Sequence, residues 1–213
     1  CHGILSVDFK FIFRSLKGKL SGKNKVVEPQ LLMRYPHQFL PLIEPPEEGY
    51  VLRPYRKGDD SGWMELLNTN GQLGVWDQSR ICSEIKSSVV EGSQLFVVHG
   101  EQIAALASVH DRRVFGVESW EIGWVATHPE HRGKGLGSWV MTAAIEVALA
   151  LPPRPIVLQT DDYRIPAIKV YLKLGFLPTY DHVSYSHRWR NVFLTLGGDY
   201  AGYNPVLEKG VAS

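Results

Sequence analysis

The chain has 213 residues, of which 44% are hydrophobic and 21% are charged, and this composition is typical of a globular protein. No apolar run approaches the ~18–20 residues that a membrane-spanning helix needs, so we predict no transmembrane segment. A formal net charge of +1 provides no broad basic surface of the kind that nonspecific nucleic-acid binding requires. The two cysteines, Cys1 and Cys82, can form neither a disulfide framework nor a CxxC zinc site, and we expect a reducing, cytoplasmic setting.

Residues 1–48 are expected to form an N-terminal extension and a proline-rich arm ahead of the main domain. The first part mixes apolar and basic residues, and two interpretations stay open: an extension packed on its own domain, or a basic amphipathic segment whose residues 1–20 contact a membrane peripherally. Residues 27–48 are rich in proline and leucine, which indicates a connecting arm.

From Gly49 onward the pattern of apolar residues becomes regular. The helix at 136–151 is the clearest element, because its apolar residues recur at i, i+3, i+4 and i+7 until Pro152 ends it. The other expected elements, in chain order, are a strand at 50–55, a helix beginning after Asp59–Ser61, a helix at 77–90, a hairpin of 95–98 and 103–109, and strands at 120–127 and 155–159, followed by a helix from 166 to 175, a strand at 176–180 and a final helix near 187–196. This order predicts an α/β sandwich around a mixed sheet, spanning residues 49–198 and followed by a tail at 199–213.

A glycine-rich turn joins the strand ending near Thr127 to the long helix. Gly133, Gly135 and Gly137 allow a ligand to approach the backbone, while the unpaired N–H groups of the helix end attract an anion. Neither the Walker A pattern nor the dinucleotide fingerprint Gly-x-Gly-x-x-Gly is present. The turn therefore indicates a pyrophosphate site of another kind, with positive charge added by Arg132 and Lys134.

Two motifs in this order resemble the GNAT acyltransferases. The run Arg132-Gly133-Lys134-Gly135-Leu136-Gly137 matches the Arg/Gln-x-x-Gly-x-Gly/Ala pyrophosphate loop of that family. The run from Ala167 to Phe176 is similar to the family's Ala-x-x-x-Tyr-x-x-x-Gly-Phe segment, and the likeness covers about residues 49–183. One departure is Arg164, which stands where many members carry a cofactor-contacting Asn.

The resemblance implies a mixed central sheet with splayed strands, flanked by helices, and acetyl-CoA as co-substrate. It implies an N-acetyltransferase in which the primary amine of an unidentified small molecule or peptide attacks the thioester directly, without a metal. An alternative from another class is a non-catalytic acyl-CoA-binding module that acts as a sensor or assembly protein. The cofactor-binding residues that the resemblance implies are Val125, Ala126, Thr127, Arg132, Gly133, Lys134, Gly135, Leu136, Gly137 and Ser138.

The resemblance also assigns two catalytic residues, Glu121 and Tyr171. On a regular strand, Glu121 would share a face with Gly123, Val125 and Thr127, opposite Trp124, where a partly desolvated carboxylate acts as a base directly or through water. A solvated or structurally paired Glu121 is the competing interpretation. Tyr171 is a sensible proton donor to the departing CoA thiolate, although a tyrosine on the inner face of a helix is usually a core residue.

Three further side chains are candidates of lower rank. Trp76 lies in the loop between the first two helices, where it would line the acceptor pocket or serve as a core residue. His128 and His131 flank Pro129, and we interpret both as exposed residues rather than metal ligands.

Overall fold

The computed structural model describes residues 28–36, 40, 43–46, 49–71 and 73–197. The two interpretations of residues 1–20 and the predicted tail at 199–213 lie outside these residues. Among the described residues, no helix combines the length and the apolar character that crossing a membrane requires.

The strands and helices follow one another in the predicted order, with one strand added ahead of them. In chain order they are β1 (Leu31–Tyr35), β2 (Tyr50–Pro54), α1 (Asp60–Thr69), α2 (Gln78–Arg80), a π-helical turn (Ile81–Lys86), β3 (Val89–His99), β4 (Gln102–Val114), β5 (Val117–Thr127), a 3₁₀ turn (Pro129–His131), α3 (Leu136–Ala150), β6 (Ile156–Thr160), α4 (Ile165–Lys173), β7 (Leu177–Pro178) and α5 (Tyr185–Leu196). The helix predicted at 77–90 ends earlier than expected, because β3 already begins at Val89.

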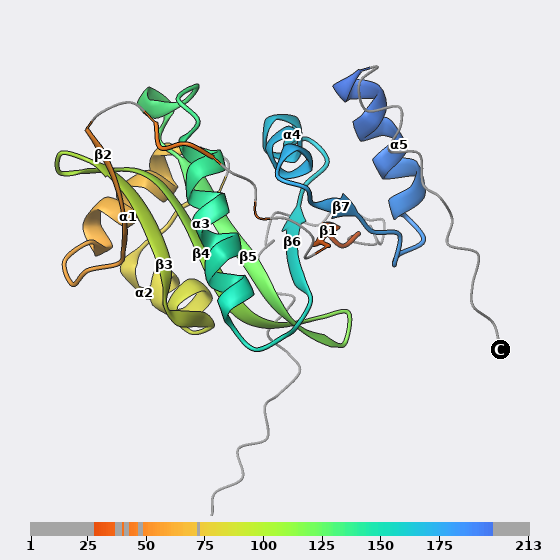
Figure 1. Ribbon diagram of the computed structural model, residues 1–213, viewed down its shortest axis with the longest axis horizontal. Helices are drawn as coiled ribbons and strands as arrows, with labels where there is room; N and C mark the ends of the chain where they lie inside the picture. The colour runs from red at the N-terminus through yellow and green to blue at the C-terminus, as the bar shows by residue number, and fades with distance from the viewer. Residues whose placement is uncertain (1–27, 37–39, 41–42, 47–48, 72, 198–213) are drawn as a thin grey trace, which may run out of the picture.

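A single mixed sheet organises the domain, with strands in the order β2-β3-β4-β5-β6-β1-β7 (Figure 1). The pair β5–β6 is parallel and the other pairs are antiparallel. Helix α3 packs on one face of β3, β4 and β5, while α1 packs on the other face. Alternate residues of a strand point to opposite faces, so β4 supplies Ala105 and Ala107 to the α3 side and Leu106 to the α1 side.

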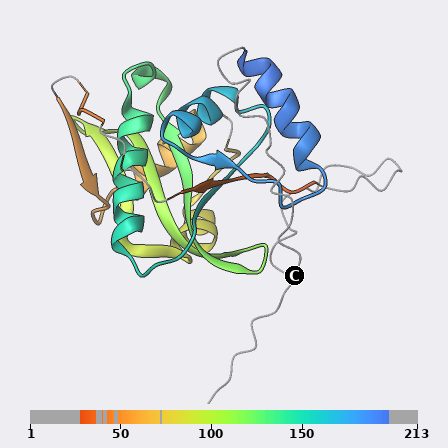
Figure 2. The same cartoon turned by 45° about the vertical axis from the view of Figure 1, so that its right-hand side comes forward.

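Strand β1 corrects the interpretation of residues 27–48 as a connecting arm. Its five residues lie between β6 and β7, and both Leu31 and Met33 are fully buried. Figure 2 shows β1 running through the sheet close to β6 and β7. A short apolar run near prolines has the local character of a linker, and its strand partners lie far away in the sequence. Pairing with β6, which the local pattern does not reveal, decides its conformation.

Strands β5 and β6 diverge, and this gap positions the candidate site. They pair only at Trp120 with Ile156 and at Glu121 with Val157. Beyond that point β5 continues along β4 to Thr127, whereas β6 pairs with β1 (Figure 1). The edge of β5 that faces β6 therefore has no strand partner among the described residues from 122 to 127.

A β-bulge interrupts β5 beside this gap. Ser108 of β4 pairs with Gly123, but Leu106 pairs with Ala126, so β5 has an extra residue between them. Trp124 takes a positive φ of 53° there, which is rare for a residue with a side chain. The bulge reverses the alternation of side chains: Ile122 packs in the α3 cluster, and Trp124 packs in the α1 cluster. The expectation that Trp124 lies opposite Glu121 on a regular strand is therefore wrong.

Candidate functional site

The glycine-rich turn forms an anion site at the end of β5. Gly133 and Gly135 have φ values of +80° and +76°, in the left-handed region that favours glycine. Gly135 is the N-cap of α3, and no side chain caps that helix, so its first-turn N–H groups are available to a ligand. Gly137 packs closely against β5, because a Cβ there would lie 3.4 Å from Thr127 Oγ1. The predicted loop residues are thus brought together beside the end of the gap.

Positive charge flanks this turn. Arg132 and Lys134 are both exposed, and the Lys134 ammonium lies 5.4 Å from the centre of the Tyr50 ring. The backbone of Ala126 and Thr127 pairs with Leu106 and Ala105 of β4, which leaves their other edge facing the gap. The strand edge without a strand partner and the uncapped N-terminus of α3 together offer backbone groups and a positive potential to an extended anionic ligand.

Glu121 lies at the closed end of the gap, where β5 and β6 are still paired. Its side chain is only 16% exposed, and Gln159 Nε2 on β6 donates a 2.9 Å hydrogen bond to Glu121 Oε1. Arg112 Nε lies 3.8 Å from the other carboxylate oxygen. Burial raises the pKa of Glu121, whereas Gln159 and Arg112 oppose that rise. The carboxylate is therefore desolvated and becomes a stronger base when ionised.

A buried histidine lies opposite Glu121 on β4. His110 is 1% exposed, and its Nδ1 and Nε2 lie 3.0 Å from Ser88 Oγ and 2.7 Å from Ser108 Oγ. Ser108 Oγ also donates to the Gly123 carbonyl at 3.3 Å, at the edge of the bulge. Desolvation, helped by the charge of Arg112, lowers the pKa of His110 to about 3. The imidazole therefore stays neutral and supports the bulge.

Tyr171 belongs to α4, which follows β6 across the gap from β5. Its residue surface is 8% exposed, and its ring meets Phe176 edge-on at 6.3 Å between centroids. Burial raises the pKa of the Tyr171 phenol to about 12, against a smaller opposing effect of Arg164. The phenol therefore keeps its proton across the whole physiological range. Tyr171 and Glu121 thus lie on different elements, on either side of the gap.

Trp76 lies in the core under α1 and is 3% exposed. Its indole N–H donates to the Leu73 carbonyl at 2.7 Å, and its ring meets Trp124 at 4.7 Å. Trp76 therefore packs against Trp124, the residue of the bulge. Its contact with an acceptor stays a prediction.

His128 and His131 are buried, at 6% and 7% exposure, so the expectation of two exposed histidines is wrong. The turn that carries them folds back against β2 and β4. Tyr50 Oη lies 2.9 Å from His131 Nδ1, and Gln102 Oε1 lies 2.7 Å from His131 Nε2. Burial lowers the pKa of His131, and the nearby His128 and His99 lower it further.

The sequence analysis gave no role in the site to three residues: Gln159, His110 and Trp124. The one available signal was a polar residue, Gln159, directly after the apolar run 156–158. A buried polar group needs a partner, so this position indicated a hydrogen bond within the fold. Nothing local marks His110 or Trp124, because their roles arise from the pairing of β4 with β5.

Solved structures of similar shape include an N-acetyltransferase and an acetyltransferase-like protein. A GCN5-related N-acetyltransferase from Sphaerobacter thermophilus aligns with a TM-score of 0.56 and 21% identity, covering 71% of this chain and 50% of that one. An acetyltransferase-like protein from Salmonella typhimurium, solved with its cofactor acetyl-CoA, aligns with a TM-score of 0.52 and 22% identity over 60% of this chain and 79% of that one. At these identities the likeness concerns the fold, and it confirms the predicted mixed sheet flanked by helices.

Curated relatives are similar in sequence over part of their length. The mycothiol acetyltransferase of Corynebacterium glutamicum is 28% identical over 122 residues, which is 57% of this chain and 41% of the relative. The chain thus spans less than half the length of that relative. The model of the "Acetyltransferase (GNAT) family" matches residues 61–176, more than half of the chain, and agrees with the predicted class of enzyme and its acetyl-CoA co-substrate. This chain therefore belongs to the GNAT acetyltransferase family.

Proposed function

We propose that this domain transfers an acetyl group from acetyl-CoA to a primary amine, which attacks the thioester directly. The observation that carries the proposal is the layout of β5. One end of this strand leads into the glycine turn, the other end holds the buried carboxylate of Glu121, and the edge between them lacks a strand partner among the described residues. From Glu121 to Thr127 the strand rises about 20 Å, which leaves room for an extended arm between the phosphates and the thioester.

The donor would lie along the open edge of β5 as an added strand. Its amide groups would pair with the backbone of Val125, Ala126 and Thr127, where β6 has moved away. Its diphosphate would lie on the N–H groups from Gly133 to Ser138, next to Arg132 and Lys134. This arrangement directs the thioester toward the bulge, where a backbone N–H stabilises the developing oxyanion.

Starting from an ammonium, the nitrogen loses two protons, one to Glu121 before attack and one to solvent as the tetrahedral intermediate collapses, and one proton must reach the thiolate. An alkyl ammonium has a pKa near ~10, so the amine must be deprotonated before or during attack. Glu121 would accept that proton directly or through water, since its raised pKa strengthens the base. The C–N bond then forms, the C–S bond breaks, and Tyr171 would supply a proton to the CoA sulfur before regaining one from solvent.

The identity of the acceptor rests on loops rather than on the shared scaffold. Curated relatives named mycothiol acetyltransferases suggest one kind of acceptor to include in a screen. Because family members build their acceptor pockets from variable loops, the proposal stops at the class of primary amines.

The test is a calorimetric titration of acetyl-CoA into the wild type and a Gly135→Glu variant, followed by amine-dependent release of free thiol. The introduced carboxylate should repel the diphosphate, and we expect micromolar binding to weaken by at least about 100-fold, the equivalent of ~2.7 kcal/mol. Gly116→Glu is the matched control, because Gly116 also has positive φ and open space around it but lies in the β4–β5 turn. It should bind as the wild type does.

Failure of the folded wild type to bind acetyl-CoA would overturn the proposal. Tight binding with no thiol release across the amine panel would favour the non-catalytic binding module instead.

A further inference from the structure

We propose that His128, Glu130 and His131 form a binding site for a divalent transition metal of the zinc class. The site lies on the 3₁₀ turn Pro129–His131, immediately before the pyrophosphate loop. The proposal concerns a second ligand of the domain and does not depend on the acyl-transfer chemistry.

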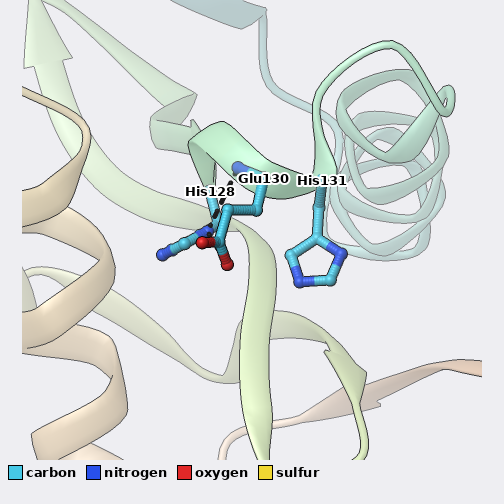
Figure 3. Close-up of side chains that lie close together, drawn as sticks. All are labelled: His128, Glu130 and His131. Carbon is cyan, nitrogen blue, oxygen red and sulfur yellow. Dashed lines mark hydrogen bonds and ion pairs between the residues drawn. The ribbon is translucent and has the colours of Figure 1, made fainter.

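The turn brings three ligand atoms of suitable chemistry together. One atom from each side chain lies within 4.8 Å of the other two. In the view of Figure 3 the carboxylate of Glu130 lies next to the His128 ring, with the His131 ring farther to the right. Zinc bonds of ~2.0–2.2 Å place neighbouring tetrahedral ligands about 3.4 Å apart, so small rotations of these side chains would complete the site. Residues three apart in a 3₁₀ turn lie above one another, which explains why His128 and His131 converge.

The surroundings hold His131 in an orientation that suits a metal. Tyr50 Oη contacts Nδ1 at 2.9 Å, so the other nitrogen, Nε2, is the one turned toward the cluster. A metal-bound histidine usually donates its second ring N–H to an oxygen atom, and Tyr50 is placed to accept it. The two imidazoles are themselves buried, so little side-chain entropy remains to be lost on binding.

The side chain of Gln102 bridges the two histidines. Its Oε1 lies 2.7 Å from His131 Nε2, and its Nε2 lies 3.3 Å from His128 Nε2. A metal would replace this amide bridge, and the amide can turn away because Gln102 begins strand β4 at the edge of the turn. Gln102 is therefore a competitor for the site, and its removal distinguishes a metal site from a hydrogen-bonded cluster.

The donor set selects the class of metal. Two imidazole nitrogens and one carboxylate suit Zn²⁺, Co²⁺ or Ni²⁺, whereas Mg²⁺ and Ca²⁺ prefer oxygen ligands alone. Three protein ligands leave a fourth position, and the 77% exposed side chain of Glu130 marks the solvent side of the site.

The test uses untagged protein treated with a chelator and then titrated with Co²⁺, whose visible spectrum reports its coordination, followed by displacement with Zn²⁺. We expect one metal per chain, with a rise in the melting temperature on zinc addition. Glu130→Gln should weaken binding by about tenfold or more without disturbing the buried core. His128→Gln and His131→Gln should remove binding, and Gln102→Ala should retain or strengthen it.

Two residues outside the cluster provide matched controls, His187→Gln on α5 and Glu146→Gln on α3, since both side chains are exposed. Both variants should bind metal as the wild type does. Absence of a one-to-one complex would overturn the metal site. Equal metal affinity in wild type and Glu130→Gln, together with loss of metal binding in Gln102→Ala, would also overturn it and leave a hydrogen-bonded cluster.

Discussion

The two ends of β5 differ in the kind of group that they present. At Thr127 the strand opens into a glycine turn whose backbone N–H groups and exposed cations face solvent. At the other end the Glu121 side chain is largely buried, and its desolvated carboxylate accepts a hydrogen bond from Gln159. The open end is suited to binding an anion, while the closed end is suited to moving a proton. Substitutions at the two ends should therefore have separable effects on binding and on turnover.

The largest effect at the closed end is expected for Glu121→Gln. Loss of the proposed base should lower kcat by about 10²- to 10⁴-fold, with the Kd of acetyl-CoA unchanged. Steady-state kinetics and calorimetry on the same preparation measure the two quantities. Glu118→Gln is the control, since Glu118 belongs to the same strand but its side chain is 59% exposed. Equal kcat values for Glu121→Gln and Glu118→Gln would show that Glu121 is not the base. The two ends of β5 would then not differ in the way proposed.

Acid should destabilise the closed end through His110. Its pKa of about 3 in the folded chain lies below the ordinary 6.5, so below pH 6.5 the unfolded chain binds the proton more readily. The free energy of unfolding should therefore fall as pH drops from 7 to 4.5, by about 2.5 kcal/mol from this residue alone. Urea unfolding at several pH values measures the slope, and His110→Asn should flatten it. An unchanged slope in His110→Asn would show that other groups cause the loss.

Tyr171→Phe should have the smallest effect of the three. Removal of the phenol leaves the packing against Phe176 in place but removes the proposed proton donor to the departing thiolate, so kcat should fall by roughly 10- to 100-fold. Tyr163→Phe, at an exposed tyrosine just before α4, is the matched control. A Tyr171→Phe enzyme with full kcat and reduced stability would assign this tyrosine to the core instead.

Local signals in the sequence determined much of this domain. The helix at 136–151 follows from apolar spacing, and the observed α3 covers Leu136–Ala150. The glycines at 133 and 135 indicated a tight turn, and both indeed take positive φ. These features depend on neighbours within a few residues, so composition and spacing suffice to reveal them.

Tertiary structure decided the features that depend on distant partners. Strand β1 exists because it pairs with β6, the bulge at Trp124 arises from the register between β4 and β5, and His131 is hydrogen-bonded to Tyr50 of the distant strand β2. The environment of Glu121 likewise depends on Gln159, a residue of another strand. Sequence alone could name the carboxylate, but its desolvation, and hence its raised pKa, results from packing between segments that only the folded chain brings together.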